Sequence, residues 1–144
     1  MIHSDTIKLL RECNAGIKMG VSSITEVVDH VKDSNMYRIL DKSREEHNRL
    51  GSRTRKLLNQ YNDSGKDPNP IAKGMSWMKT NLKLTVNDTD ATVADLMTDG
   101  CNMGVKSLSR YLNQYKAAEE EVKDITKKLI KLEEQLSVDM REYL

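Results

Sequence analysis

The sequence predicts an all-α protein, and three observations support this prediction. Apolar residues recur at alternating steps of three and four through most of the 144 residues. Phe is absent and Pro occurs only twice, whereas Lys, Glu, Leu and Met are abundant, which favours helix over sheet. The stretch Cys13-Asn14-Ala15-Gly16-Ile17-Lys18 returns as Cys101-Asn102-Met103-Gly104-Val105-Lys106, so we expect two related helical hairpins.

The first predicted helix begins near Ser4 or Asp5, because either side chain can cap a helix. Its apolar stripe continues at helical spacing as far as Val31. The polar cluster at 33–35 then ends this helix and supplies a turn.

The second predicted helix is capped by Ser34 or Asn35, and its core face extends to Tyr61. The middle of this face is unusually polar, because four residues interrupt the apolar stripe: Ser43, Glu46, His47 and Thr54. A buried carboxylate near an imidazole is a pair whose pKa values shift. We interpret the interruption as a satisfied polar cluster, or as side chains that bend to the helix surface. The alternative is that Glu46 and His47 are remnants of a metal site.

A long connection follows the second helix. The stretch from Asn62 to Pro70 combines Asn, Gly and two prolines and cannot remain helical. Beyond it, a short amphipathic helix is predicted from Ile71 to Leu84, with Trp77 on its flank and a stripe of Ile71, Met75, Met78 and Leu82. The link from Asn62 to Thr89 is long enough to return along a bundle, so the second and third helices should be parallel.

The third helix is predicted after a cap within 87–90, with a stripe from Val93 to Tyr115. The fourth carries a stripe from Ile125 to Tyr143. The join at 113–119 contains no Gly or Pro. We still predict a break there, because one unbroken helix would reach roughly 80 Å and could not bury its stripe within a monomer.

The glycines and cysteines in the helix centres are expected to have structural roles. Glycine inside a helix costs roughly 1 kcal/mol relative to Ala, so Gly16, Gly20 and Gly104 indicate close packing of the first helix on the third. Cys13 and Cys101 are interpreted as buried thiols, because apolar mid-helix surroundings do not activate a cysteine. The alternative is a redox pair related by the symmetry of the two hairpins.

With these elements the chain resembles the ferritin-like superfamily, and within it small bacterial proteins of uncharacterised function. The matching residues are the Cys and Gly near the middle of the first and third helices, and the segment Ser76-Trp77-Met78-Lys79-Thr80-Asn81-Leu82. The resemblance implies one domain over 1–144: a ferritin-like four-helix bundle of two hairpins, joined by a long crossover that contains a fifth short helix.

Active ferritin-like proteins hold two iron or manganese ions with a Glu from each of two helices and a Glu-x-x-His from each of the others. The only histidines here are His3, His30 and His47, so the fourth helix cannot supply that motif. Glu46 is followed at the required spacing by Arg49. We therefore predict no catalytic residue, no cofactor and no metal. The alternative is an altered iron or manganese site drawn from Glu12, Glu46, His47, Glu133 and Glu134.

The nearly even balance of charges does not indicate a polyanionic partner. The formal net charge is +1, from 23 Lys and Arg against 22 Asp and Glu, so neither nucleic acid nor membrane is expected as a partner. The first residues lack a signal-peptide pattern and no apolar run approaches membrane-spanning length, which predicts a cytoplasmic protein.

The predicted function is therefore a non-catalytic bundle that forms a homo-oligomer or binds a protein partner through the crossover helix, whose Met and Trp side chains suit an interface. An enzyme is not expected. The alternative function is a di-iron or manganese carboxylate protein, either an oxidase or an iron-handling protein, with an altered metal site.

Overall fold

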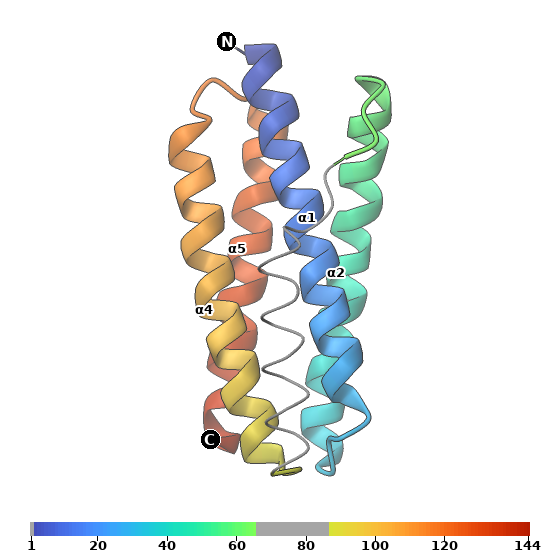
Figure 1. Ribbon diagram of the computed structural model, residues 1–144, viewed down its shortest axis with the longest axis vertical. Coiled ribbons are helices and arrows are strands. Elements are labelled where there is room, and N and C mark those ends of the chain that lie inside the picture. Colours follow the sequence, from blue (N-terminus) through green and yellow to red (C-terminus); the bar gives the residue numbers. More distant parts are fainter. Residues whose placement is uncertain (1, 66–86) are drawn as a thin grey trace.

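Four long helices make up the described part of the structure. The computed structural model describes residues 2–65 and 87–144, which form α1 (Ile2–Val28), α2 (Ser34–Gln60), α4 (Asp90–Gln114), α5 (Glu120–Met140) and the short 3-10 helix η1 (Arg141–Tyr143). Helices α1 and α2 form one hairpin and α4 and α5 a second, and the two hairpins pack into a four-helix bundle (Figure 1). The all-α prediction is confirmed. The helix predicted from Ile71 to Leu84 lies outside the described residues.

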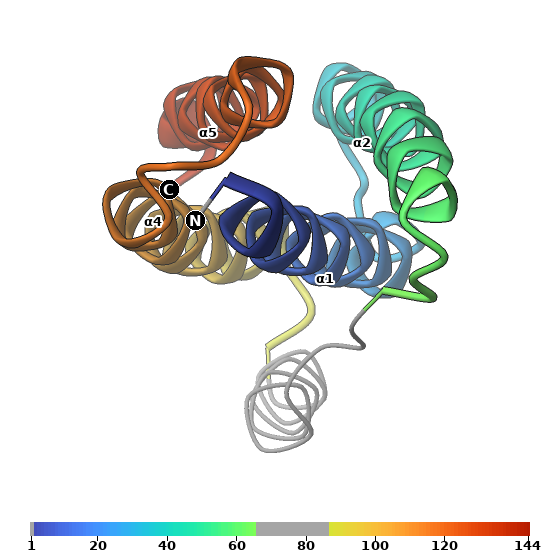
Figure 2. The ribbon, with the colours of Figure 1, turned by 90° about the horizontal axis from the view of Figure 1, so that it is seen from above.

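The order of the helices determines which faces meet. Helices α2 and α4 run in the same direction, and the described chain stops and resumes at opposite ends of the bundle (Figure 1). Seen from above, α1 lies beside α4 on one face of the bundle and α2 and α5 lie on the other (Figure 2). The predicted parallel arrangement of α2 and α4 is confirmed.

The helix ends differ slightly from the predicted ones. The carboxylate of Asp33, rather than the side chain of Ser34 or Asn35, caps α2 by accepting a hydrogen bond from the Met36 amide at 2.8 Å. Thr89, within the predicted range, caps α4 by accepting from the Thr92 amide at 3.1 Å. Turn-type backbone bonds at His30 and Val31 close α1 after Val28, so α1 ends before its apolar stripe does.

The predicted break between α4 and α5 is present, and α1 holds it in place. The Asp5 carboxylate accepts a hydrogen bond from the Ala117 amide at 3.0 Å, and the Thr6 hydroxyl accepts from the Glu119 amide at 2.9 Å. Amides in the first turn of a helix have no partner within the helix. Asp5 and Thr6 therefore each satisfy one backbone donor of the α4–α5 turn, and Asp5 lies in the first turn of α1 rather than at its cap position.

The core consists of three apolar clusters along the bundle axis. Cys13 belongs to the cluster near the start of α1, Ile17 to the middle cluster and Cys101 to the cluster near the end of α1. The two cysteines of the repeat therefore lie in different layers of the core.

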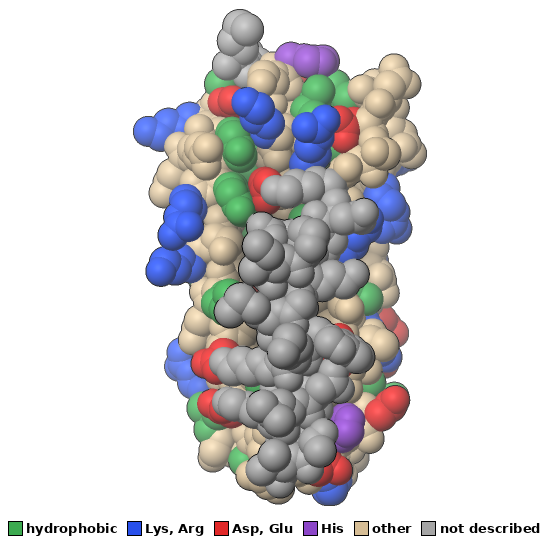
Figure 3. Space-filling model, viewed as in Figure 1, with side chains coloured by type: hydrophobic (Ala, Val, Ile, Leu, Met, Phe, Trp, Pro, Cys, Tyr) green, Lys and Arg blue, Asp and Glu red, His purple; other side chains and the backbone are tan. Residues whose placement is uncertain are grey.

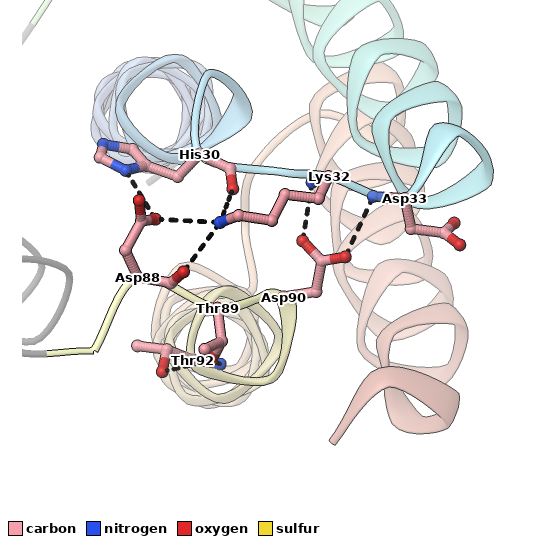
Figure 4. Close-up of polar contacts among 7 residues, drawn as sticks. All are labelled: His30, Lys32, Asp33, Asp88, Thr89, Asp90 and Thr92. Atoms are coloured by element: carbon pink, nitrogen blue, oxygen red, sulfur yellow. Dashed lines mark hydrogen bonds and ion pairs between the residues drawn. The ribbon is translucent and has the colours of Figure 1, made fainter.

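One described end of the crossover is fastened to the α1–α2 turn (Figure 4). The Asp90 carboxylate accepts hydrogen bonds from the amides of Lys32 and Asp33 at 2.8 and 3.0 Å. Nδ1 of His30 lies 3.0 Å from Oδ1 of Asp88, and Nζ of Lys32 donates to the Asp88 carbonyl at 2.8 Å. The hydrogen bond with His30 lowers the pKa of Asp88. The chain therefore re-enters the bundle beside the end of α1.

The other described end is fastened near the start of α1. The Asp63 amide donates to the Leu58 carbonyl at 3.0 Å while Asn62 has φ 55°, which closes α2 with a Schellman-type end. Arg11 forms a bidentate ion pair with Asp63 and lowers the pKa of that carboxyl. Gly65, at φ 85°, lies against Asn14 of α1. One described end of the crossover therefore contacts α1 near its start, and the other contacts the turn that follows α1.

Candidate functional site

The centre of the bundle holds a buried pair, His47 from α2 and Glu133 from α5. His47 has no exposed surface and Glu133 is 8% exposed. Nε2 of His47 lies 3.0 Å from Oε1 of Glu133, and Nδ1 lies 2.8 Å from the carbonyl oxygen of Ser43. A carbonyl oxygen only accepts hydrogen bonds, so Nδ1 carries a proton. The contact with Glu133 then requires one further proton, shared between Nε2 and the carboxyl group.

The surroundings favour the imidazolium–carboxylate form of this pair. Burial lowers the pKa of His47, but the hydrogen bond and the negative charge of Glu133 outweigh it, with smaller contributions from the Ser43 carbonyl and Glu46. The pKa of His47 is raised as a result. On α4, burial raises the pKa of the Cys101 thiol, and the neighbouring Glu133 raises it further.

Two glycines make room for the pair. A Cβ on Gly20 of α1 would lie 2.7 Å from both Cδ2 and Nε2 of His47, which is too close for a methyl group. A Cβ on Gly104 of α4 would lie 3.6 Å from the carboxyl carbon of Glu133. For Gly16 the nearest atoms belong to the side chains of Leu108 and Leu129, at 3.8 Å. The predicted packing of α1 on α4 accounts for Gly16, where one of the nearest atoms belongs to Leu108 of α4. It does not account for Gly20 and Gly104, where the nearest atoms belong to His47 and Glu133 of the other two helices.

A cavity of about 300 Å³ adjoins the pair and is called the α1/α4 cavity below, because all but one of its lining residues belong to those two helices. Glu133 contributes to its wall from α5. It reaches the surface at Gly100 and at Met103, which is 65% exposed. Charged side chains of both signs surround this face of the molecule, with acidic ones prominent in its lower half (Figure 3).

The structure brings together only part of the residue set named for a metal site. His47 and Glu133 are in contact, and Glu12 lines the cavity. Glu46 is half-buried on α2, and Glu134 is exposed. Within 2–65 and 87–144, no three His, Cys, Asp or Glu side chains gather in a way that could hold a metal ion.

Sequence reasoning identified the polar middle of α2, but it named Glu133 only within the alternative metal set and did not predict its pairing with His47. The interpretation of a satisfied polar cluster is confirmed for His47, whose ring nitrogens both have partners. The signal that the sequence did contain was Gly20, since a glycine in an apolar stripe leaves space for a large side chain from another helix.

The two cysteines are buried thiols, as predicted. Sγ of Cys13 lies 3.1 Å from the Thr126 hydroxyl, and burial raises the pKa of Cys13 to about 11. Cys101 is likewise buried and free. Both thiols therefore remain protonated at neutral pH, which is the opposite of an activated cysteine.

The fold and site define a four-helix bundle of two hairpins with a buried histidine–glutamate pair beside a cavity. Comparison of the chain with known proteins gave no match to a family model, to a curated protein or to a solved structure. Among the described helices, none is long and apolar enough to cross a membrane.

Proposed function

We propose that this chain is a non-catalytic bundle of the ferritin-like type that acts by docking an amphipathic helix, formed by residues 71–84, over the α1/α4 cavity. The docked helix comes from the same chain in a monomer or from a second copy in a homo-oligomer. The observation that carries this proposal is that one described end of the crossover contacts α1 near its start and the other contacts the turn that follows α1, while the cavity lies along α1 between them.

The length of the connection fits this arrangement. The chain leaves the described bundle at Gly65 beside Asn14 and returns at Asp88 beside His30. Along α1, the distance from Asn14 to His30 is about 24 Å, and a helix over 71–84 would be about 21 Å long. A helix of that length can therefore follow α1 from one attachment to the other.

The receiving surface also has suitable chemistry. Met19, Met97 and Met103 line the cavity together with small residues of both helices. Methionine adapts to irregular apolar partners, and an amphipathic helix commonly binds by laying its apolar face into such a groove. The stripe of Ile71, Met75, Met78 and Leu82 is the largest apolar element of the sequence outside the four long helices.

Trp77 is the only tryptophan and lies within the docking segment, so its fluorescence reports docking directly. We expect blue-shifted Trp77 emission in the native protein, and a red shift in Met78→Asp but not in the control Lys79→Asp. Light scattering during size-exclusion chromatography distinguishes the source of the helix. A monomer indicates the chain's own segment, and a larger species that dissociates in Met78→Asp indicates a second copy. Native emission equal to that of the unfolded chain would refute docking.

The alternative of an iron or manganese protein has one observation in its favour, which is that His47 and Glu133 meet at the bundle centre. Each of these two side chains already satisfies the other, and two ligands are too few for a carboxylate-bridged pair of metals. Helix docking is therefore the function that the described geometry supports better.

A further inference from the structure

Met103 of α4 lies at the rim of the α1/α4 cavity with its side chain largely in solvent. It is 65% exposed, the highest value among the exposed large apolar side chains of the described residues. The others in that group, Tyr37, Val138 and Leu144, do not line the cavity. Met19 lines the wall that α1 contributes. The edge of the cavity on α4 therefore offers a flexible apolar side chain to a docked partner.

The direction of a docked helix follows from the places where the described chain stops and resumes. The chain leaves the bundle at Gly65 beside Asn14 and returns at Asp88 beside His30. A helix over 71–84 would therefore run parallel to α1 and antiparallel to α4, since α1 and α4 run in opposite directions (Figure 1). Only short links separate 71–84 from these two attachments, so the occupant is the chain's own segment.

The rotation of the docked helix follows from its handedness. Met78 belongs to the stripe that faces the cavity, and each residue turns an α-helix by about 100°, so Trp77 and Lys79 lie on opposite flanks. Seen from the end where α1 begins, with the face of α1 and α4 toward the bottom of the view, α4 lies to the left of α1 (Figure 2). A right-handed helix that runs away from this viewpoint turns clockwise. Trp77 would therefore lie over α4 and Lys79 over α1.

Trp77 and Met103 also lie at the same level along the bundle. Gly16 of α1 lies beside Leu108 of α4. Because the two helices are antiparallel, Met103 is level with about residue 21 of α1. A helix over 71–84 that is centred between its two attachments has its midpoint level with about residue 22 of α1. Trp77 is next to that midpoint, so it lies within about one helical turn of Met103 along the axis.

We propose that Met103 anchors the docked helix on α4 by packing against the indole ring of Trp77. This inference rests on the proposed docking of residues 71–84 and adds the orientation of the helix. A methionine sulfur packs favourably at about 5 Å from an aromatic ring, often at the ring edge. Trp77 has the largest side chain of the segment, and Met103 is the exposed apolar side chain that α4 places beside it. Lys79 stays on the α1 side, away from this contact.

The test is NMR spectroscopy of the full chain with carbon-13 in the methionine methyl groups, in which Met103→Leu and Met19→Leu assign the two signals. We expect a nuclear Overhauser effect between the Trp77 ring protons and the Met103 methyl group, and none to Met19. If Trp77 emission is blue-shifted but the effect is absent, or is at least as strong to Met19 as to Met103, the anchor is overturned and docking stands. Native emission equal to that of the unfolded chain overturns both.

Trp77 fluorescence in matched variants gives a second measurement. Met103→Ala removes the anchor and should shift the emission to the red, by less than Met78→Asp does, because the apolar stripe can still dock. Asn102→Ala is the control, since Asn102 is exposed on the same helix and does not line the cavity. Equal emission in Met103→Ala and Asn102→Ala would show that Trp77 does not pack on Met103, and the red shift in Met78→Asp would still report docking.

Discussion

Substitution of Gly20 by Ala tests the buried pair directly. At an ordinary helical glycine, Ala stabilises the fold by about 1 kcal/mol because it restricts the unfolded chain and favours helix. At Gly20 the added Cβ would lie 2.7 Å from two ring atoms of His47. The ring cannot move aside, because its two nitrogens are held by Ser43 and Glu133 at 2.8 and 3.0 Å.

The expected magnitude follows from these opposing effects. Forcing an extra methyl group into a packed core costs about 1–3 kcal/mol, and separating a buried ion pair adds a further cost of the order of 3 kcal/mol if it is complete. After subtraction of the propensity gain, Gly20→Ala should lower the free energy of unfolding by about 2 kcal/mol. Gly100→Ala is the control, and with open space around its Cβ it should raise that free energy by about 0.5–1 kcal/mol.

The assay is urea denaturation followed by circular dichroism at pH 6, with the native chain and both variants measured side by side. A second observable is the NMR signal of the His47 ring, which should move in Gly20→Ala and stay in place in Gly100→Ala. If both alanine variants were stabilised equally, the ring would not be confined against Gly20, and the account of the pair given above would be wrong.

Three further predictions concern pH, the crossover and metal. The pKa of His47 is raised from 6.5 in the folded state, so the contribution of the His47–Glu133 pair to stability is complete below pH 6.5 and is lost as pH rises through the folded pKa. Urea titrations across this pH window should show the loss of stability in the native chain and not in Glu133→Gln. Met78→Asp should cost at least about 2 kcal/mol if its side chain is buried by docking, whereas Lys79→Asp should stay within about 0.5 kcal/mol, and equal small effects in urea would contradict docking. Reconstitution with ferrous iron followed by elemental analysis should leave only a trace of iron, and one retained equivalent that is lost in Glu46→Ala would restore the metal alternative.

The helices were predictable because their apolar stripes follow the helical period, but the α4–α5 turn shows what local patterns omit. No Gly or Pro marks the turn, and the hydrogen bonds that fix it come from Asp5 and Thr6. These partners lie 112 and 113 residues away from Ala117 and Glu119. The break could be inferred only from the length that an unbroken helix would have.

The candidate site was predictable in composition but not in pairing. The interrupted stripe of α2 placed His47 in the core, since a polar residue at an apolar position is conspicuous. The carboxylate that contacts His47 depends on the rotation of α5 about its axis and on its position along α2. The local spacing of residues determines neither the rotation nor the position. Glu133 and Glu134 are adjacent, yet one is buried against His47 and the other is exposed.

The two copies of the internal repeat, 13–18 and 101–106, have similar residues but different burial. Both cysteines are buried, but Asn14 is 2% exposed while Asn102 lies on the surface. Ala15 is buried, and its counterpart Met103 is 65% exposed beside the cavity. The two copies therefore have different surroundings, since Cys13 lies in the core cluster near the start of α1 and Cys101 in the cluster near its end.

The division of the buried pair between the two hairpins has a consequence for synthesis of the protein. His47 belongs to the first hairpin, and Glu133 lies near the end of the last helix, so the first hairpin is translated well before its counter-ion exists. Until then, the imidazole has its ordinary pKa and is mostly neutral in a slightly alkaline environment. When the second hairpin docks, the raised pKa makes His47 take up a proton from the solvent. Between pH 6.5 and the folded pKa of His47, docking of the two hairpins therefore takes up a proton at this site, and mild acidification within that window favours docking.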